Sequence, residues 1–372
     1  MKKLLFIFGT RPEAVKLAPL ILALQKSTEL DLRICNTGQH REMAEKTLSF
    51  FSLRSDYNLN VMQQNQTLIA LQARIMEKLS ALLERECFDG IIVQGDTMST
   101  YCGALTGYYC KIPVFHVEAG LRSASIDEPF PEEGLRQMIT RIAALHFTPD
   151  HNAAKNLLKE NIPQEKIVVT GNTVIDALCS LTPEHYSHAE KELLEYGVQP
   201  ERKTVLATVH RRENHGERLE HILAALQHIA ERFPEHQIVI PVHPNPAVKE
   251  RVTEKLSPYK NILLLPPLDY PLLCFLMKHS ALILTDSGGI QEEAPTFGTP
   301  ILVMREKTER NEGVFRGCAI LVGTETEKIF TTAEDFLLHP EKRYYGENPY
   351  GDGNASERIL ETIINFYNVE QK

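Results

Sequence analysis

Residues 285–305 read TDSGGIQEEAPTFGTPILVMR, and this stretch decides the fold of the second half of the chain. An apolar run, residues 281–284, stops just before Ser287, and the glycines Gly288 and Gly289 lead directly into a segment of helical character. Backbone amides at a helix start, next to glycines that let a ligand approach closely, form a seat for an anion. The stretch therefore predicts a strand-to-helix turn that can hold a phosphate group.

Two carboxylates, Glu292 and Glu293, follow within about a turn of this seat. A carboxylate suits the positive end of a helix but would repel a phosphate in contact with it, so one of the two should face hydroxyl groups instead. A phosphate on the amides and a carboxylate on a ribose together describe a nucleoside diphosphate. An ordinary Ser-capped helix with a Gly-Gly turn is the alternative for this segment on its own.

The amino terminus repeats the arrangement. Residues 4–8 form a short apolar run, and Thr10 and Glu13 then have the spacing of a capping box at a helix start. Arg11 and Lys16 are five residues apart, so both could reach a phosphate at the helix entrance. Two solvated surface charges are the alternative interpretation.

Length and composition limit the number of domains and the classes of partner that the protein can have. The 372 residues suit two domains, and 43% hydrophobic with 24% charged residues is typical of a globular protein. A net charge of -9 argues against nucleic acid as a partner, and no apolar run is long enough for a membrane span. Seven cysteines without CxxC pairing indicate reduced thiols and a cytoplasmic location. The fourteen histidines show no metal-ligand spacing, so no metal is expected.

Short apolar runs alternate with helix-length segments along both halves. This alternation predicts an α/β fold with two Rossmann-like domains, whose parallel sheets are covered by helices and face each other across a cleft. We expect the first domain at 1–172 and the second at 173–354, followed by a last helix within 355–372. The expected strands are 4–8, 32–35, 90–93, 113–117, 146–148 and 167–170 in the first half, and 204–209, 237–241, 262–265, 281–284, 301–304 and 319–322 in the second.

Reactive side chains fall where these strands end. Asp96 and Glu118 follow two runs of the first half, and His210 and His243 follow two runs of the second. Because ligands bind at the carboxyl ends of parallel strands, we expect these groups and both phosphate seats to line one catalytic cleft. Singly, each has a structural alternative, such as a helix cap for Asp96.

Eight blocks now carry a family resemblance. They are GTRPE at 9–13, TGQHREM at 37–43, QGDT at 94–97, HVEAGLR at 116–122, PEE at 131–133, TGNTVID at 170–176, HRRE at 210–213 and the segment around Ser287. In these blocks, which span nearly the whole chain in order, the sequence resembles the non-hydrolysing bacterial UDP-N-acetylglucosamine 2-epimerases. The resemblance implies a glycosyltransferase-B-like fold, a homodimer, interconversion of UDP-GlcNAc with UDP-ManNAc without a cofactor, and a last helix that crosses back onto the first domain.

The chemistry of such a reaction limits the route. The C2 proton of the sugar is not next to a carbonyl, and the chain has no GxGxxG motif to hold a nicotinamide. Loss of UDP from C1 would acidify the C2 proton and give 2-acetamidoglucal; re-addition with protonation on the other face would complete the inversion. This route needs carboxylates for both faces of C2 and cationic groups for the leaving diphosphate.

The resemblance also implies roles for individual residues. Asp96 and Glu132 would be the proton-transfer pair, Glu118 a third essential carboxylate, and His210 a partner of the diphosphate. The positions that would hold UDP are Arg11, Lys16, Ser287, Gly288, Gly289, Glu293 and Arg310, with Glu293 on the ribose.

The family also has a second nucleotide-sugar site, which acts as an activator site. The residues that match it or lie near it are Gln39, His40, Arg74, Glu133 and His243. Two departures concern this site and the uracil: Glu42 stands where some relatives have glutamine, and the segment 268–273 lacks the aromatic that some relatives place near the base.

Three other functions stay open. A hydrolysing relative would release ManNAc and UDP, but such enzymes carry a different opening motif in place of residues 9–13. A glycosyltransferase of this fold would need an acceptor and would leave the three carboxylates unexplained. A non-catalytic sensor would bind UDP-GlcNAc without turnover.

Overall fold

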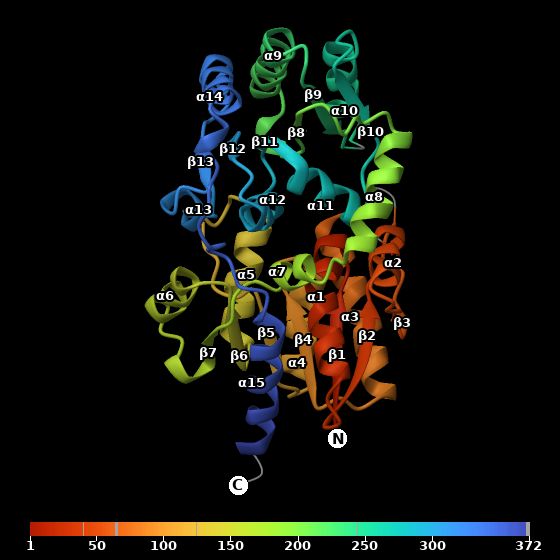
Figure 1. Ribbon diagram of the computed structural model, residues 1–372. Helices are drawn as coiled ribbons and strands as arrows, with labels where there is room; N and C mark the ends of the chain where they lie inside the picture. Colours follow the sequence, from red (N-terminus) through yellow and green to blue (C-terminus); the bar gives the residue numbers. More distant parts are fainter. Residues whose placement is uncertain (40, 64–65, 124, 244, 370–372) are drawn as a thin grey trace. The chain divides into compact units, whose positions relative to one another are not determined.

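The chain divides into two compact units, Met1–Ser180 with Tyr350–Lys372, and Leu181–Pro349. The computed structural model describes residues 1–39, 41–63, 66–123, 125–243 and 245–369. Both units are α/β, as expected, with helices packed against parallel sheets (Figure 1).

The first unit is built on a seven-stranded sheet with the order β3-β2-β1-β4-β5-β6-β7, and all pairings are parallel. Its strands are β1 (Lys2–Phe8), β2 (Leu30–Asn36), β3 (Tyr57–Asn58), β4 (Gly90–Gln94), β5 (Val114–Val117), β6 (Leu145–Thr148) and β7 (Ile167–Val169). Its helices are α1 (Arg11–Gln25), α2 (Arg41–Phe50), α3 (Leu68–Arg85), α4 (Met98–Tyr109), α5 (Glu132–Ile142), α6 (His151–Lys159), η1 (Gln164–Lys166), α7 (Thr173–Cys179) and α15 (Ala355–Val369).

The second unit has a six-stranded parallel sheet with the order β10-β9-β8-β11-β12-β13. Its strands are β8 (Thr204–Thr208), β9 (Gln237–Pro241), β10 (Ile262–Leu265), β11 (Ser280–Thr285), β12 (Ile301–Val303) and β13 (Ala319–Leu321). Its helices are α8 (Pro183–Glu195), η2 (Arg212–Asn214), α9 (Glu217–Arg232), α10 (Pro246–Leu256), α11 (Tyr270–His279), α12 (Gly288–Glu293), η3 (Ala294–Phe297), α13 (Asn311–Phe315), α14 (Thr326–Leu338) and η4 (Pro340–Lys342).

The central strands carry continuous apolar runs because helices cover both faces of each sheet. In β1 the run from Leu4 to Phe8 is completely buried, and in β8 Val205, Leu206 and Ala207 are equally inaccessible. Each of the twelve expected strands is present within one or two residues of its expected ends. The two-residue β3 was not expected, because its sequence carries no apolar run.

Helix α7 belongs to the first unit, although residue 172 was expected to end that domain. It packs against α1 and α15, so the first unit extends to Ser180 and is completed by the last helix. The buried Asp176 of α7 accepts hydrogen bonds from the backbone amides of Ser356 and Ala355 at 2.7 and 3.2 Å. At the other end of α15, the Tyr367 hydroxyl donates to the Asp89 carbonyl at 2.9 Å, so hydrogen bonds hold the helix near both of its ends.

Candidate functional site

Several of the candidate residues lie at the point where the strand order of each sheet reverses. In the first unit the neighbouring strands β1 and β4 lead into Thr10 and Asp96. In the second unit the neighbours β8 and β11 lead into His210 and Ser287 (Figure 1). Ligands of open α/β sheets bind outside the carboxyl ends of the strands at such switch points. Each unit therefore has one edge that is suited to a ligand.

Glu13 holds two of these turns together in the first unit. One of its oxygens accepts hydrogen bonds from Thr10 and from the Gly9 amide, and the other accepts from the hydroxyls of Thr97 and Thr100 at 2.8 Å each. The capping box expected for Thr10 and Glu13 is present. Burial raises the pKa of this carboxyl, and the hydrogen bonds from the hydroxyls and amides act against that shift. Glu13 therefore fixes the turn after β1 against the turn after β4.

Glu118 pairs with Lys16 in the buried part of the same edge. The Lys16 Nζ lies 2.6 Å from the Glu118 Oε2, and the two side chains are only 10% and 7% exposed. Gln94 donates a second hydrogen bond to the same oxygen. Glu118 has a φ of 63°, a left-handed conformation that is uncommon for a residue with a side chain and is often found at functional sites. Lys16, expected on a phosphate, is in this structure the counter-ion of a candidate catalytic carboxylate.

Asp96 pairs with a residue that the sequence analysis did not select. The Arg136 Nη2 of α5 donates to the Asp96 Oδ2 at 2.5 Å, and the Arg136 Nη1 lies 3.1 Å from the Glu133 Oε2. Glu133 is fully buried and also accepts hydrogen bonds from the Ser123 amide and the Gln137 amide group. Glu132, in contrast, is partly exposed at the start of α5.

His116 supports the turn that carries Asp96. Its Nε2 is 2.8 Å from the Gly95 carbonyl, and Gly95 has a φ of 75° that favours glycine. Burial lowers the pKa of His116 to about 4, so the ring is neutral and Nε2 donates this hydrogen bond at neutral pH. Arg11 is the first residue of α1 and is partly exposed. It follows β1, the neighbour of the strand β4 that leads into the Asp96 turn.

A fully buried aspartate, Asp286, organises the switch point of the second unit. Its carboxylate accepts hydrogen bonds from the His210 and Arg211 amides and from the Asn214 side chain, at 2.9 to 3.2 Å. The His210 Nδ1 lies 3.0 Å from the Asp286 Oδ1. Burial alone would raise the pKa of Asp286, but the hydrogen bonds and the charge of His210 outweigh it and hold this pKa below its usual value. A carboxylate on Nδ1 orients the imidazole and leaves Nε2 for a ligand.

His243 stacks on His210, with ring centroids 5.9 Å apart and planes inclined by 23°. Burial lowers the pKa of His243, and the neighbouring His210 lowers it further. At neutral pH the His243 ring is therefore an uncharged stacking partner of the His210 ring.

The seat around Ser287 is shorter than the sequence suggests, because α12 spans only Gly288–Glu293 before a 3-10 turn. The cation beside this turn is Arg310, whose Nε and Nη2 both lie 2.9 Å from the buried Glu292. A Cβ on Gly288 would stand 3.0 Å from the Arg310 Cζ, so the glycine lets the guanidinium lie against the helix start. Glu309 also pairs with Arg310 at 2.9 Å, and the charges of Arg310, Arg305 and Arg211 hold the pKa of Glu309 far below its usual value against the effect of burial.

Glu293 is largely buried, and its Oε1 lies 3.5 Å from the position of a Cβ on Gly289. The segment 268–273 does contain an aromatic residue, Tyr270, but it is only 6% exposed. Burial raises the pKa of Tyr270, with Cys274 and Glu293 adding to the shift. Of the two adjacent glutamates, Glu292 is therefore the partner of Arg310, and Glu293 lies beside Gly289 and Tyr270.

Of the residues that resemble an activator site, all but His243 belong to the first unit, and His243 follows β9 in the second unit. The Gln39 Oε1 accepts from the Ser99 hydroxyl at 2.5 Å. Arg74 on α3 donates to the Val61 carbonyl and to Gln66 and Gln63. His40 lies outside the described residues. Glu133, as described above, is engaged with Arg136 below the surface.

Within the described residues, no group of three or more histidine, cysteine, aspartate or glutamate side chains could hold a metal ion. None of the helices over these same ranges is both long and apolar enough to cross a membrane.

The family model for UDP-N-acetylglucosamine 2-epimerase matches residues 22–364 of the chain. The chain belongs to this epimerase family. A UDP-N-acetylglucosamine 2-epimerase of Neisseria meningitidis is 43% identical over 97% of this chain and 99% of its own length. The corresponding epimerase of Salmonella typhimurium is 45% identical over 98% of this chain and 99% of its own length.

Solved structures of this epimerase family share the fold. The Neisseria meningitidis epimerase bound to UDP-GlcNAc superposes with a TM-score of 0.93 over 98% of this chain and 100% of that chain, at 43% identity. The Methanocaldococcus jannaschii epimerase in complex with UDP-GlcNAc and UDP gives a TM-score of 0.85 over 98% of this chain and 99% of that chain, at 35% identity.

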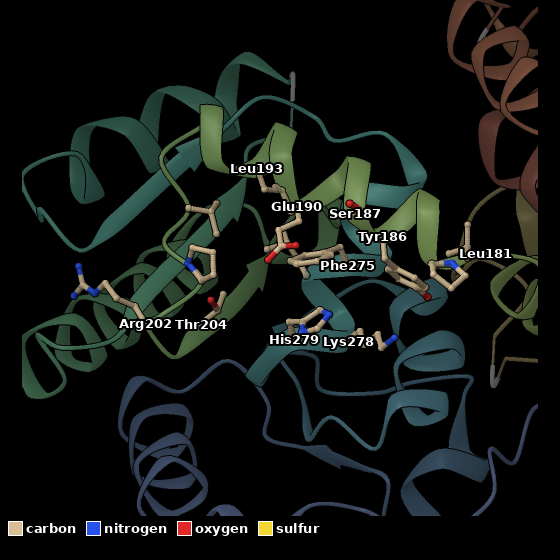
Figure 2. A pocket seen from close by; sticks show the side chains of 14 residues that line it. Leu181, Tyr186, Ser187, Glu190, Leu193, Arg202, Thr204, Phe275, Lys278 and His279 are labelled. Carbon is tan, nitrogen blue, oxygen red and sulfur yellow. The ribbon is translucent and has the colours of Figure 1, made fainter.

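A pocket of about 640 Å³ lies in the second unit of this epimerase family member, between α8 and α11 (Figure 2). Its walls include Tyr186 and Phe275. The Lys278 Nζ lies over the Tyr186 ring, 4.3 Å from the ring centroid, and Phe275 stacks on His279. None of the predicted site residues lines it. Thr204, the first residue of β8, is in the wall, so the pocket lies at the amino end of that strand and not at the carboxyl edge where ligands of such sheets bind.

Sequence reasoning missed three residues that fix the predicted ones: Arg136, Asp286 and Glu309. Asp286 stood in the opening stretch and ends a strand run, so its position alone could have marked it. Arg136 lies one turn from Glu132 and Glu133, but its partner Asp96 is 40 residues away and no sequence spacing relates the two.

Proposed function

We propose that the protein interconverts UDP-GlcNAc and UDP-ManNAc by eliminating and re-adding UDP, without hydrolysing the nucleotide sugar. The observation that carries the proposal is the pair Asp96 and Glu118, which follow the adjacent strands β4 and β5 in a member of this epimerase family. Each carboxylate is paired with a largely buried cation, Arg136 or Lys16.

The first unit supplies the groups that exchange the C2 proton. An ionised carboxylate on one face of C2 accepts the proton as UDP departs, and a protonated group on the other face delivers a proton when UDP returns. Asp96 and Glu132 take these roles in the proposal, and Glu118 orients the sugar. The intermediate is 2-acetamidoglucal, which stays bound together with UDP.

The second unit supplies the groups that hold UDP. Arg310 at the Gly288 turn and His210, oriented by Asp286, are placed on the diphosphate, whose negative charge grows as the bond to C1 breaks. Glu293 takes the ribose hydroxyls. Arg11 and Lys16 of the first unit complete the anion contacts, and for Lys16 this requires a change of partner from Glu118 to phosphate.

The proposed setting is cytoplasmic, where nucleotide sugars serve surface polysaccharide synthesis, and the proposed assembly is a homodimer. All seven cysteines are free thiols, which fits a reducing compartment. The proposed second site for UDP-GlcNAc, around Gln39, Arg74, Glu133 and His243, would act as an activator site.

One experiment tests the reaction. The purified protein is incubated with UDP-GlcNAc in heavy water without nicotinamide or metal, and the C2 protons and products are followed by NMR. We expect both UDP-linked epimers, each with deuterium at C2. Free ManNAc as the main product would make the protein a hydrolysing enzyme, and epimers that keep protium at C2 would exclude the elimination route.

A further inference from the structure

Arg136 is a buried cation that serves two carboxylates at once. Its side chain is only 5% exposed; on one side it meets the fully buried Glu133, and on the other side it meets Asp96, whose side chain is 26% exposed. Its well-directed hydrogen bond goes to the more accessible partner, from Nη2 to Oδ2. The contact to Glu133 is an ion pair one turn back along α5.

Part of the hydrogen-bonding capacity of Arg136 is not used by the described residues. Its Nε is buried without an acceptor among them, and its Nη1 makes the ion pair with Glu133 but no hydrogen bond. An arginine whose role is purely structural is expected to satisfy its donors, because a buried polar group without a partner costs free energy.

Arg122, in the same unit, is such a structural arginine. Its guanidinium donates to both oxygens of Glu160, to the Leu121 carbonyl and to the Thr140 hydroxyl. Its side chain is 11% exposed, and none of these partners is a candidate catalytic group. The difference between the two arginines lies in their partners and not in their burial.

We propose that Arg136 is a positioning residue for the epimerisation, which acts through Asp96. Glu133 holds the guanidinium on one side, and the guanidinium holds the Asp96 Oδ2 on the other, so that the Oδ1 is presented to the C2 proton. This inference rests on the proposed function and assigns to Asp96 the part of proton acceptor at the start of the reaction.

The geometry explains why arginine is needed. The planar guanidinium reaches two carboxylates with different nitrogens, which a lysine ammonium on a flexible stem cannot do with the same precision. A displacement of a reacting group by about 1 Å can cost roughly 100-fold in rate. Loss of Arg136 is therefore expected to reduce kcat by roughly that factor, while the affinity for UDP, which Arg136 is not proposed to contact, stays within about threefold.

A double-mutant cycle separates positioning from general support of the fold. We would measure kcat for Arg136→Met, Asp96→Asn and the combined variant, together with UDP affinity by calorimetry and the melting temperature. If Arg136 acts through Asp96, the combined variant is as slow as Asp96→Asn alone, because the effects of residues that act as a unit are not additive. Arg136→Lys, which keeps the charge, should recover part of the rate.

Arg122→Met is the matched control. It should lower the melting temperature but leave kcat within about threefold of wild type, because Glu160, Leu121 and Thr140, the groups that Arg122 contacts, have no proposed role in the reaction. The variant Glu133→Gln with Arg136→Met removes both buried charges, so it tests the rate even if Arg136→Met alone folds poorly. A combined Asp96 and Arg136 variant that loses the full product of both single effects would overturn the proposal, as would wild-type kcat in a folded Arg136→Met protein. If the wild-type protein itself fails to epimerise UDP-GlcNAc, the proposed function fails, and that result is distinct from either outcome.

Discussion

At the scale of single residues, the candidate carboxylates differ in what they are paired with. Glu118 shares a largely buried ion pair with Lys16, whereas Glu132 lies partly exposed at the start of α5. Removing one partner of a buried pair leaves an uncompensated charge, which typically costs about 3 kcal/mol or more. The same chemical change therefore has different consequences at the two positions.

Glu132→Gln should reduce turnover by about 100- to 10,000-fold, the usual contribution of a general acid-base group, and Glu118→Gln should reduce it by at least roughly 100-fold, because the sugar is no longer oriented. Glu118→Gln should also lower the melting temperature, because it breaks the largely buried ion pair with Lys16, while Glu132→Gln should leave it nearly unchanged. Steady-state rates and thermal melts measure both effects. A Glu132→Gln variant with more than about a tenth of the wild-type rate would remove that residue from the mechanism.

Glu293 and Arg11 are expected to act at different steps. Glu293→Ala removes the proposed ribose contact, so UDP affinity should fall by at least about tenfold, the equivalent of one good hydrogen bond to a charged group. Arg11→Ala should mainly slow turnover. Calorimetry with UDP and steady-state rates separate the two, with Glu334→Ala, which breaks the surface pair with Arg232, as the control. Unchanged UDP affinity in the Glu293 variant would mean that the Ser287 turn is not a nucleotide site.

At the scale of elements, the neighbouring strands β5 and β6 bring two buried histidines, His116 and His146, into register. Burial lowers the pKa of His116 to about 4 and that of His146 to about 3. Both rings are neutral when folded but become charged near pH 6.5 when unfolded. Above pH 6.5 the two rings are neutral in both states and the free energy of unfolding is at its full value. As the pH falls from 6.5 toward the folded pKa values, only the unfolded state takes up protons, so the free energy of unfolding decreases.

We expect the free energy of unfolding to fall by about 2 kcal/mol per histidine when the pH is lowered from 7 to 5. His146→Phe should remove its share, so urea unfolding at the two pH values should show a clearly smaller difference than in wild type. The exposed His151 on α6 is the control, and His151→Ala should keep the full difference. An unchanged pH dependence in His146→Phe would show that this ring is not buried neutral.

The elements were largely predictable from the sequence, and the residue contacts were not. Strands such as β8 and β11 could be predicted because a parallel strand covered on both faces is continuously apolar. The membership of α7 could not, because the polar composition after residue 180 marks a connection without saying which sheet the preceding helix packs against. The pairs of Asp96 with Arg136 and of Glu118 with Lys16 join residues 40 and 102 positions apart, and no local pattern encodes such distances.

At the scale of the whole molecule, the proposed homodimer has a candidate surface in the first unit. The helices α4 and α5 pack together and expose Tyr108, Tyr109 and Met138, with the two tyrosines 56% and 68% accessible. Exposed aromatic side chains of this kind often mark association surfaces. We expect a dimer at micromolar concentration in sedimentation experiments, and partial dissociation when Tyr108 and Tyr109 are both changed to Glu. Tyr345→Glu, at an exposed position of the second unit, is the control, and a wild-type monomer would contradict the assembly.

The capping of α15 by Asp176 has a consequence for biosynthesis. The second unit consists of one continuous stretch, but the first unit needs both ends of the chain. During translation, residues 181–349 can therefore complete their sheet while the earlier part still lacks its final helix. The domain that leaves the ribosome first is thus completed after the second one, and the surface of α1 and α7 that α15 covers stays open to chaperones until α15 has been synthesised.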